Sequence, residues 1–280
     1  MGKWGPNVAT KNDLIQHCPN PKKWTVVKPN GLHIVNKAIS KNTACKIKAK
    51  MLAPSFPWVQ RFKRFPKTAH FNFWRIGPFV GDEQQRTFAD EHPEIYALCN
   101  EAVASMNAKV ATDDPNSTFC DSFVAESVSV HLHKPNWGLG AHYDDAHDEG
   151  VGKVLMVSLG TEKESPKETR KPRTFLFTDP VFGRQFPVST PSRQAVLFEG
   201  DCYDFWRHES VRDKRQTGDC LSFTIRLKSV DGYVGIEHDL REYPRGAPPA
   251  EAQAHKRLRA KHDITDRRVE SPAKKPAAEN

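Results

Sequence analysis

The sequence lacks the features that mark a membrane protein or a disulfide-rich secreted domain. None of its apolar runs approaches the roughly 18 residues that a membrane-spanning helix needs. The N-terminus carries charge where a secretory signal would need an apolar segment, and the six cysteines are scattered without a Cys-x-x-Cys pair. We therefore expect no membrane partner and a reducing, intracellular location, in the nucleus or the cytoplasm.

Acidic residues are almost missing from the first 75 positions. That stretch holds fifteen Lys or Arg against the single acid Asp13, residues 241–280 hold ten against six, and the whole chain is only +8. The middle of the chain must therefore be acidic. Basic ends beside an acidic body are typical of a protein that binds DNA or RNA through residues 1–75 and the C-terminal tail, because clustered cations release counterions from phosphates. The alternative is that these charges only keep the chain in solution.

Hydrophobic spacing predicts helices first and a β-rich region after them. Residues 31–39 resemble a strand, Ser40 can cap a helix over about 41–52, and a second helix begins near Pro93. From residue 123 short alternating runs are separated by turn residues, which favours a sandwich or barrel over a parallel α/β sheet. The expected strands are 123–133, 141–144, 153–159, 174–178, 184–189, 194–199, 202–208 and 220–229.

Three side chains of this region can form a metal site. His142 and Asp144 lie two apart on an extended segment and project to the same side, whereas Asp145 points the other way. A third ligand must come from another strand, and His208 is the best candidate. Two histidines and a carboxylate leave three positions open on a ferrous ion, as in non-haem oxygenases. His-x-Asp pairs also arise by chance, and a zinc hydrolase could use the same residues.

Two strands carry polar side chains on one face only. The polar residues of these faces are Ser127, Ser129, His131 and His133 in the first strand, and Cys220, Ser222, Thr224, Arg226 and Lys228 in the second. Such a face is either exposed to solvent or lines a wet cavity. An arginine inside a barrel needs an anionic partner, which for Arg226 is either a dicarboxylate cosubstrate or an acidic residue of the middle segment.

The order of these motifs resembles the AlkB-like branch of the Fe(II)/2-oxoglutarate-dependent dioxygenases, over roughly residues 31–229. His142-Tyr143-Asp144 is similar to the family's His-x-Asp, and His208 to its distal histidine. Residues 157–160 followed by 173–177 are similar to its strand-turn-strand segment. The run from Leu221 to Arg226 is similar to its terminal strand.

The resemblance implies an α+β fold with a jelly-roll barrel, or double-stranded β-helix, and N-terminal helices packed on one sheet. It implies Fe(II), 2-oxoglutarate and dioxygen as cofactor and cosubstrates. The implied metal ligands and catalytic residues are His142, Asp144 and His208. The implied cosubstrate-binding residues are Arg226, Thr224, Ser222 and His133.

The implied activity is oxidative demethylation of alkylated or methylated nucleobases in DNA or RNA, in DNA repair or RNA modification. Two alternatives stay open. One is a 2-oxoglutarate-dependent hydroxylase of a protein or a small molecule. The other is a non-enzymatic nucleic-acid-binding protein on a degenerate barrel. We expect a monomer in either case.

The sequence departs from the family at two positions near the implied cosubstrate. Cys220 stands where many members have an additional arginine, six residues before the last one, so that one carboxylate contact is missing or comes from elsewhere. His131-Leu132-His133 stands where the family often has Asn-x-Tyr, and His133 could replace the tyrosine as a hydrogen-bond donor.

The family's substrate-binding elements precede the barrel, in what is here the basic part of the chain. Residues 58–65 and 71–75 interleave aromatic rings with cations. This pattern can stack an extruded base and hold the flanking phosphates, or the rings can simply pack a core. The domain bounds we expect are a basic extension over 1–30, a dioxygenase domain over 31–235 with helices and a nucleic-acid-binding lid over 31–122 and a jelly-roll core over 123–230, and a basic, disordered tail over 236–280 with a short helix near 250–261.

Overall fold

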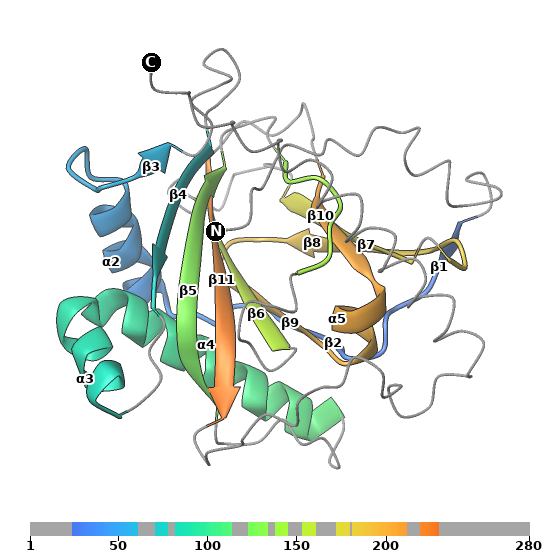
Figure 1. The fold of residues 1–280 in the computed structure, drawn as a ribbon, viewed down its shortest axis with the longest axis horizontal. Helices are drawn as coiled ribbons and strands as arrows, with labels where there is room; N and C mark the ends of the chain where they lie inside the picture. The colour runs from blue at the N-terminus through green and yellow to red at the C-terminus, as the bar shows by residue number, and fades with distance from the viewer. Residues whose placement is uncertain are drawn as a thin grey trace, which may run out of the picture.

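The computed structural model describes residues 24–60, 71–77, 82–113, 123–133, 138–144, 153–160, 172–179, 181–211 and 219–229. Within these residues two mostly antiparallel sheets form the body of the protein, and helices cover one of them (Figure 1). The helices are α2 (Lys41–Met51), α3 (Asp82–Glu91), α4 (Pro93–Asp113) and α5 (Asp201–Phe205). None of the described helices is long and apolar enough to cross a membrane.

The larger sheet contains seven strands in the order β2-β9-β6-β11-β5-β4-β3, and all its pairs are antiparallel. Its strands are β2 (Leu32–Val35), β9 (Gln194–Glu199), β6 (Lys153–Gly160), β11 (Cys220–Ser229), β5 (Phe123–His133), β4 (Phe71–Ile76) and β3 (Val59–Gln60). The long strands β5 and β11 pair along their whole length, with one register shift between Arg226 and Leu227. This shift lies next to the arginine that the sequence singles out.

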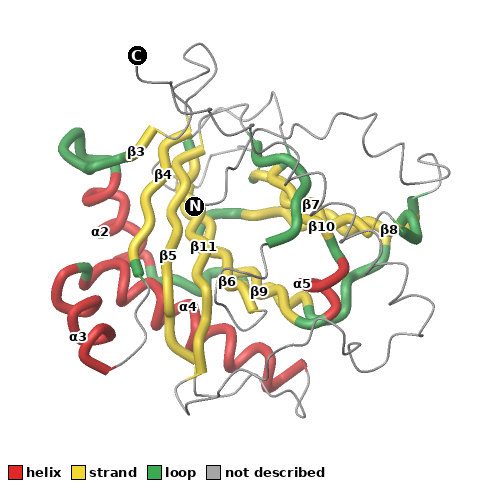
Figure 2. The backbone as a smooth tube through the Cα atoms, viewed as in Figure 1, coloured by secondary structure: helices red, strands yellow, loops and turns green. Residues whose placement is uncertain are grey.

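The smaller sheet has the order β1-β8-β7-β10 and faces the larger one (Figures 1 and 2). Its strands are β1 (Thr25–Val26), β8 (Arg184–Thr190), β7 (Arg173–Asp179) and β10 (Arg207–Ser210). The short β1 pairs parallel with β8, and the other pairs are antiparallel. Two facing antiparallel sheets with helices on one outer face are a jelly roll of the α+β class, so the expected fold class is confirmed.

The helix-covered face of the larger sheet contains the main hydrophobic core. Strand alternation places the odd-numbered residues of β11 and β6 on this face, where they pack against buried side chains of α2 and α4. Ser40 caps α2 by accepting a hydrogen bond from the Thr43 amide at 3.1 Å, and α4 begins at Pro93, both as the sequence predicts. Because successive side chains of a strand point to opposite sides, burial of this face also determines which side chains of the same strands point to the smaller sheet.

That opposite face lies between the two sheets and has an apolar half. Here the larger sheet contributes Leu32, Val154, Met156, Val196 and Phe198, and the smaller sheet contributes Phe175, Phe177 and Val188. Cys202, Tyr203 and Trp206 close this cluster from α5 and the residue after it. The two sheets are therefore held together by a second core, separate from the one under the helices.

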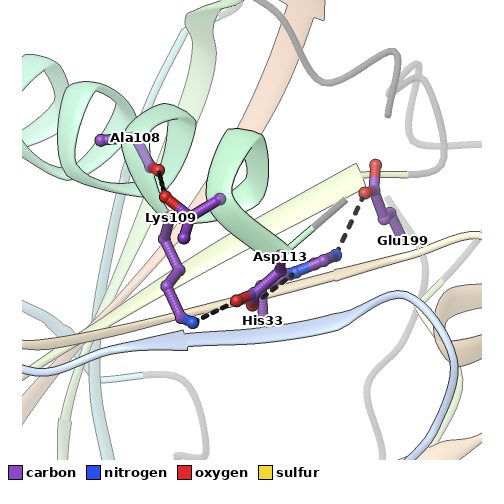
Figure 3. A network of polar contacts seen from close by, with 6 residues as sticks. His33, Ala108, Lys109, Asp113 and Glu199 are labelled. Atoms are coloured by element: carbon purple, nitrogen blue, oxygen red, sulfur yellow. Dashed lines mark hydrogen bonds and ion pairs between the residues drawn. The ribbon is translucent and has the colours of Figure 1, made fainter. Parts of the chain in front are cut away.

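A polar network joins the end of α4 to three strands, and Figure 3 shows the part of it around His33. His33 of β2 lies 3.7 Å from Asp113 through Nδ1 and 3.6 Å from Glu199 through Nε2. Lys109 pairs with Asp113, and Lys153 of β6 lies 2.9 Å from Glu199. These charges tie the edge strand β2 to α4 and to β9.

Two of the expected elements differ from the structure. Residues 202–208 do not form one strand: Asp201–Phe205 is the helix α5, and the strand β10 begins only at Arg207. Residues 141–144 do not form a named strand, and only an isolated bridge between His142 and His208 is present there. The helix expected near 250–261 lies outside the described residues, and the domain bounds stay a prediction.

Candidate metal centre

The backbone holds the segment 138–144 against the strand β10. His142 and His208 exchange two backbone hydrogen bonds, at 3.1 Å and 2.9 Å. The Ser210 amide donates to the Leu139 carbonyl at 3.0 Å, and the buried Arg207 donates from Nη2 to the Ala141 carbonyl at 2.7 Å. These four bonds bring two histidines that are 66 positions apart in the sequence to directly opposed places.

The side chains of His142, Asp144 and His208 converge from this bridge. The Asp144 Oδ1 atom lies 3.9 Å from Nε2 of His142 and 3.8 Å from Nε2 of His208. The donor atoms of the three residues all lie within 4.8 Å of one another, and no other such group of three occurs in the part of the chain that the structure describes. The structure therefore brings together the three residues that the sequence selects, close enough to share one ion.

Hydrogen bonding and burial prepare the two imidazoles to bind a cation. The Gly140 carbonyl lies 2.8 Å from Nδ1 of His142, and since a carbonyl only accepts, this contact turns Nδ1–H to the backbone and leaves Nε2 on the side of Asp144. Burial, and next the nearby His142, lower the pKa of His208 to about 3. The imidazole of His208 is thus neutral at pH 7, the form that acts as a metal ligand.

The donor set fits a divalent cation. Asp144 is only 7% exposed, and a buried carboxylate is costly unless opposite charge or hydrogen bonds compensate it. It faces two imidazole nitrogens, of which at least that of His208 is neutral. Two nitrogens and one carboxylate oxygen on adjacent positions form the facial arrangement that is typical of ferrous sites in oxygenases.

Aromatic rings form an apolar wall behind His208. The ring centroids of Phe198, Phe175 and Phe177 lie 4.9, 5.4 and 6.2 Å from that of His208. His142 packs on the other side, with its centroid 4.3 Å away. The wall keeps water from this side of the cluster and holds the His208 ring in place, because packed aromatic side chains have few alternative rotamers.

The other half of the space between the sheets is polar. Strand alternation turns the even-numbered residues of β11 away from the helix-side core, and the paired residues of β5 turn with them. The residues of this polar face include Ser127, Ser129, His131, His133, Cys220, Ser222, Thr224 and Arg226. The sequence predicts this arrangement, in which β11 has one polar face and one apolar, buried face.

The structure places Arg226 on this face at the level of the metal centre. It is buried, and it pairs with Val154 of β6, which in turn pairs with Phe198 of β9. Because the Phe198 ring contacts His208, these three strands are in register with the cluster. Thr224 and Ser222 are half-buried on the same face of β11, further from that level.

His133 lies at the far end of β5, opposite Cys220 of β11. It is buried and its ring stacks on that of His131, with centroids 5.9 Å apart. Burial, and next the charge of Arg173, lower its pKa to about 3, so that His133 is a neutral imidazole with one N–H to donate. Arg173, at the start of β7, is a buried cation that the sequence analysis did not select.

The two aromatic and basic stretches are described only in part. Residues 61–70 lie outside the described residues, and β4 pairs with β5 through backbone positions 71–76. Trp58 is described, and its Nε1 donates to the Met51 carbonyl at 2.9 Å while its ring packs beside Phe56. This residue therefore belongs to the helix-side core, which was the alternative expectation for these rings.

No family model matches the sequence, and no curated protein matches it either. The fold and the cluster together define a jelly-roll protein with a two-histidine, one-carboxylate centre. Several solved structures are similar to this chain. OsALKBH1 is 15% identical, with a TM-score of 0.47, over 72% of this chain and 100% of its own.

Two further similar structures are named as oxygenases or hydroxylases. A prolyl-4-hydroxylase from Pseudomonas putida is 12% identical, with a TM-score of 0.40, over 70% of this chain and 92% of its own. An oxidoreductase of the 2OG-Fe(II) oxygenase family from Burkholderia pseudomallei is 10% identical, with a TM-score of 0.47, over 74% and 96%.

Proposed function

We propose that this protein is an Fe(II)- and 2-oxoglutarate-dependent oxygenase. The observation that carries the proposal is the convergence of His142, Asp144 and His208 on one point inside a jelly roll. When bound there, iron with 2-oxoglutarate and dioxygen supplies an oxidation that hydroxylates a C–H bond of the substrate and turns 2-oxoglutarate into succinate and carbon dioxide. Arg226 stands at the level of these ligands as a fixed positive charge for the cosubstrate.

The residues around such a site would have three different roles. The two Nε2 atoms and the Asp144 carboxylate would hold the metal. The Phe198 and Phe175 rings exclude water behind His208. The serines of β5 and the residues Ser222 and Thr224 of β11 supply hydroxyl groups that orient polar atoms of a ligand in this half.

We further propose that the substrate is a methylated or alkylated base in DNA or RNA, and that the product is the demethylated base. Hydroxylation of an N-methyl carbon gives an N-hydroxymethyl group that leaves as formaldehyde. The support for this substrate is the uneven charge of the sequence, with fifteen basic residues against one acid in the first 75 positions. Such a segment binds phosphates, and an extruded base can then enter a site between the two sheets.

The test measures succinate and formaldehyde with the full-length protein, ferrous iron and a panel of methylated DNA and RNA oligomers. We expect both products, and loss of both in His142→Ala and His208→Ala. His92→Ala is the matched control, because His92 lies between α3 and α4, beside Phe88 of the helix-side core and away from the metal ligands. No succinate with any substrate would refute the oxygenase, whereas succinate without formaldehyde from any oligomer would refute the nucleic-acid substrate.

A further inference from the structure

Arg173 lies in a cluster at the end of the interior opposite to Arg226. Its Nη2 atom donates to the His133 carbonyl at 3.4 Å, and so joins the start of β7 to the end of β5. His133 pairs with Cys220 of β11, and the Cys220 thiol lies 3.3 Å from the Ser158 hydroxyl of β6. Four strands from both sheets therefore meet around one guanidinium group.

Strand alternation places Arg173 on the same face as the aromatic wall of the metal centre. Arg173, Phe175 and Phe177 are two positions apart from one another in β7, and both phenylalanine rings contact His208. His208 pairs with Phe177, four residues along the strand from Arg173, or about 13 Å at the usual rise per residue. The Arg173 side chain reaches across to the end of β5, so the guanidinium and the metal ligands lie at two separate points of one interior face, as the two ends of a short dicarboxylate held by the metal would require.

The surroundings of Arg173 favour an anionic ligand. Arg173 is only 7% exposed, and burial lowers its pKa, against which the nearby Cys220 and Asp219 act in the opposite direction. Burial raises the pKa of the Cys220 thiol, and His133 is neutral, so both neighbours inside the cluster are uncharged at pH 7. A carboxylate at this point would meet a fixed cation, an imidazole N–H and a serine hydroxyl.

We propose that Arg173 binds the distal carboxylate of 2-oxoglutarate and so determines which 2-oxo acid the site accepts. The inference rests on the proposed function. It explains the departure of this sequence at position 220, because the guanidinium reaches from the smaller sheet to His133, which pairs with Cys220 of β11. His133 donates a second hydrogen bond to the same carboxylate. Arg173 is here a binding residue, not a residue of the metal centre.

The experiment compares two ligands by calorimetry without oxygen, on the full chain loaded with Mn(II). The ligands are 2-oxoglutarate and 2-oxopentanoate, in which a methyl group replaces the distal carboxylate. We expect the protein to bind 2-oxoglutarate on the order of 100-fold more tightly, as for a charge-assisted pair away from water. Arg173→Gln should abolish this preference and leave the affinity for 2-oxopentanoate within a few-fold.

Three variants separate this role from a structural one. Asp219→Asn tests whether Arg173 serves only to neutralise Asp219, and Arg193→Gln removes another buried arginine, whose Nη1 donates to the Ile39 carbonyl near α2. Both should keep the preference for 2-oxoglutarate. In the double variant Arg173→Gln with Cys220→Arg, a guanidinium on β11 should restore it.

The outcomes that overturn the inference differ from those that overturn the proposed function. If the unmutated protein binds both ligands equally, or if Arg173→Gln keeps the preference, Arg173 does not hold the carboxylate although the oxygenase proposal stands. If neither ligand binds the metal-loaded protein, the oxygenase proposal itself fails. If Arg173→Gln does not fold, Arg173→Lys replaces it. Loss of the planar guanidinium should still lower the affinity for 2-oxoglutarate several-fold. An unchanged affinity would refute the role of Arg173.

Discussion

The aromatic wall behind His208 leads to a prediction about how packing controls metal affinity. Phe198 is 2% exposed, and its ring lies 4.9 Å from that of His208 and 5.7 Å from that of Phe177. Replacing Phe198 by Leu keeps the site apolar but removes both ring contacts. The His208 ring then loses one of the groups that fix its orientation toward Asp144.

The size of the effect follows from the contacts that are lost. An aromatic pair contributes about 0.5–1.5 kcal/mol beyond its buried area. Two such pairs are lost, so that Phe198→Leu should lower the free energy of unfolding by about 1–3 kcal/mol. Only the pair with His208 bears on the metal, and its loss should weaken metal binding by about 2- to 10-fold.

The assay pairs urea unfolding of the metal-free protein with calorimetry of Mn(II) binding. Phe223→Leu is the matched control, because Phe223 is fully buried in β11 but faces the helix-side core. Both variants should be destabilised, and only Phe198→Leu should bind Mn(II) more weakly. If both variants bind Mn(II) as the unmutated protein does, or both lose affinity to the same extent, the wall does not orient His208.

Three further predictions concern other parts of the fold. Burial alone would raise the pKa of Glu199, but the hydrogen bond from His33 and the charge of Lys153 together lower it. A lowered pKa stabilises the protein above about pH 4.5, and this contribution is lost as the pH falls through the pKa of the folded state. Glu199→Gln should therefore lower the free energy of unfolding by about 1–3 kcal/mol at pH 7 and by much less at pH 3.5, as measured by urea titration. Ser40→Ala should lower the free energy of unfolding by about 1 kcal/mol, through the lost cap of α2, with unchanged Mn(II) affinity. Asp144→Asn should abolish the stabilisation by Mn(II), which is about 2.7 kcal/mol at 100 times the dissociation constant, and a melting temperature that still rises with Mn(II) would contradict the metal centre.

The helices α2 and α4 could be predicted because local signals determine them, whereas α3 was not predicted. Ser40 precedes a helix whose apolar residues recur at helical spacing, and Pro93 stands where a first helical turn tolerates it. The strands β5, β6, β7, β8, β9 and β11 could also be predicted, because alternating or apolar runs between turn residues show in the sequence. These elements need no knowledge of which partners they pack against.

The segment 202–208 shows where strand patterns mislead. Cys202, Tyr203 and Trp206 all lie in the core between the sheets, and the first and last are four positions apart, which is helical spacing. Gly200 precedes them with a φ of 51°, a left-handed conformation that turns the chain before α5 begins. The aromatic residues of this segment are typical of strands and favour the prediction of an extended chain. The helix α5 has only five residues, too few for a helical repeat to be recognised in the sequence.

The residues of the site also differ in whether the sequence alone can identify them. His142 and Asp144 could be selected because they are neighbours on one extended segment, and His208 because it follows at a plausible distance. Arg173 has an equally visible alternation with Phe175, but nothing in the sequence states that β7 lies opposite β5 and β11. That arrangement comes from packing of two sheets through residues far apart in the chain, and local patterns do not encode it.

The interior of the jelly roll therefore separates stability from function by strand position. One half of the space between the sheets is filled by aliphatic and aromatic side chains that favour folding, and the other half buries Asp144, Arg173 and Arg226, which oppose it unless they bind one another or a ligand. The helix-side core, which includes Phe223 and the buried face of α4, contributes stabilising free energy that offsets the cost of these buried charges. Because alternate residues of β11 lie on opposite faces of the sheet, Leu221 can pack in the helix-side core while Cys220 and Ser222 belong to the polar face, and substitutions in one set need not disturb the other.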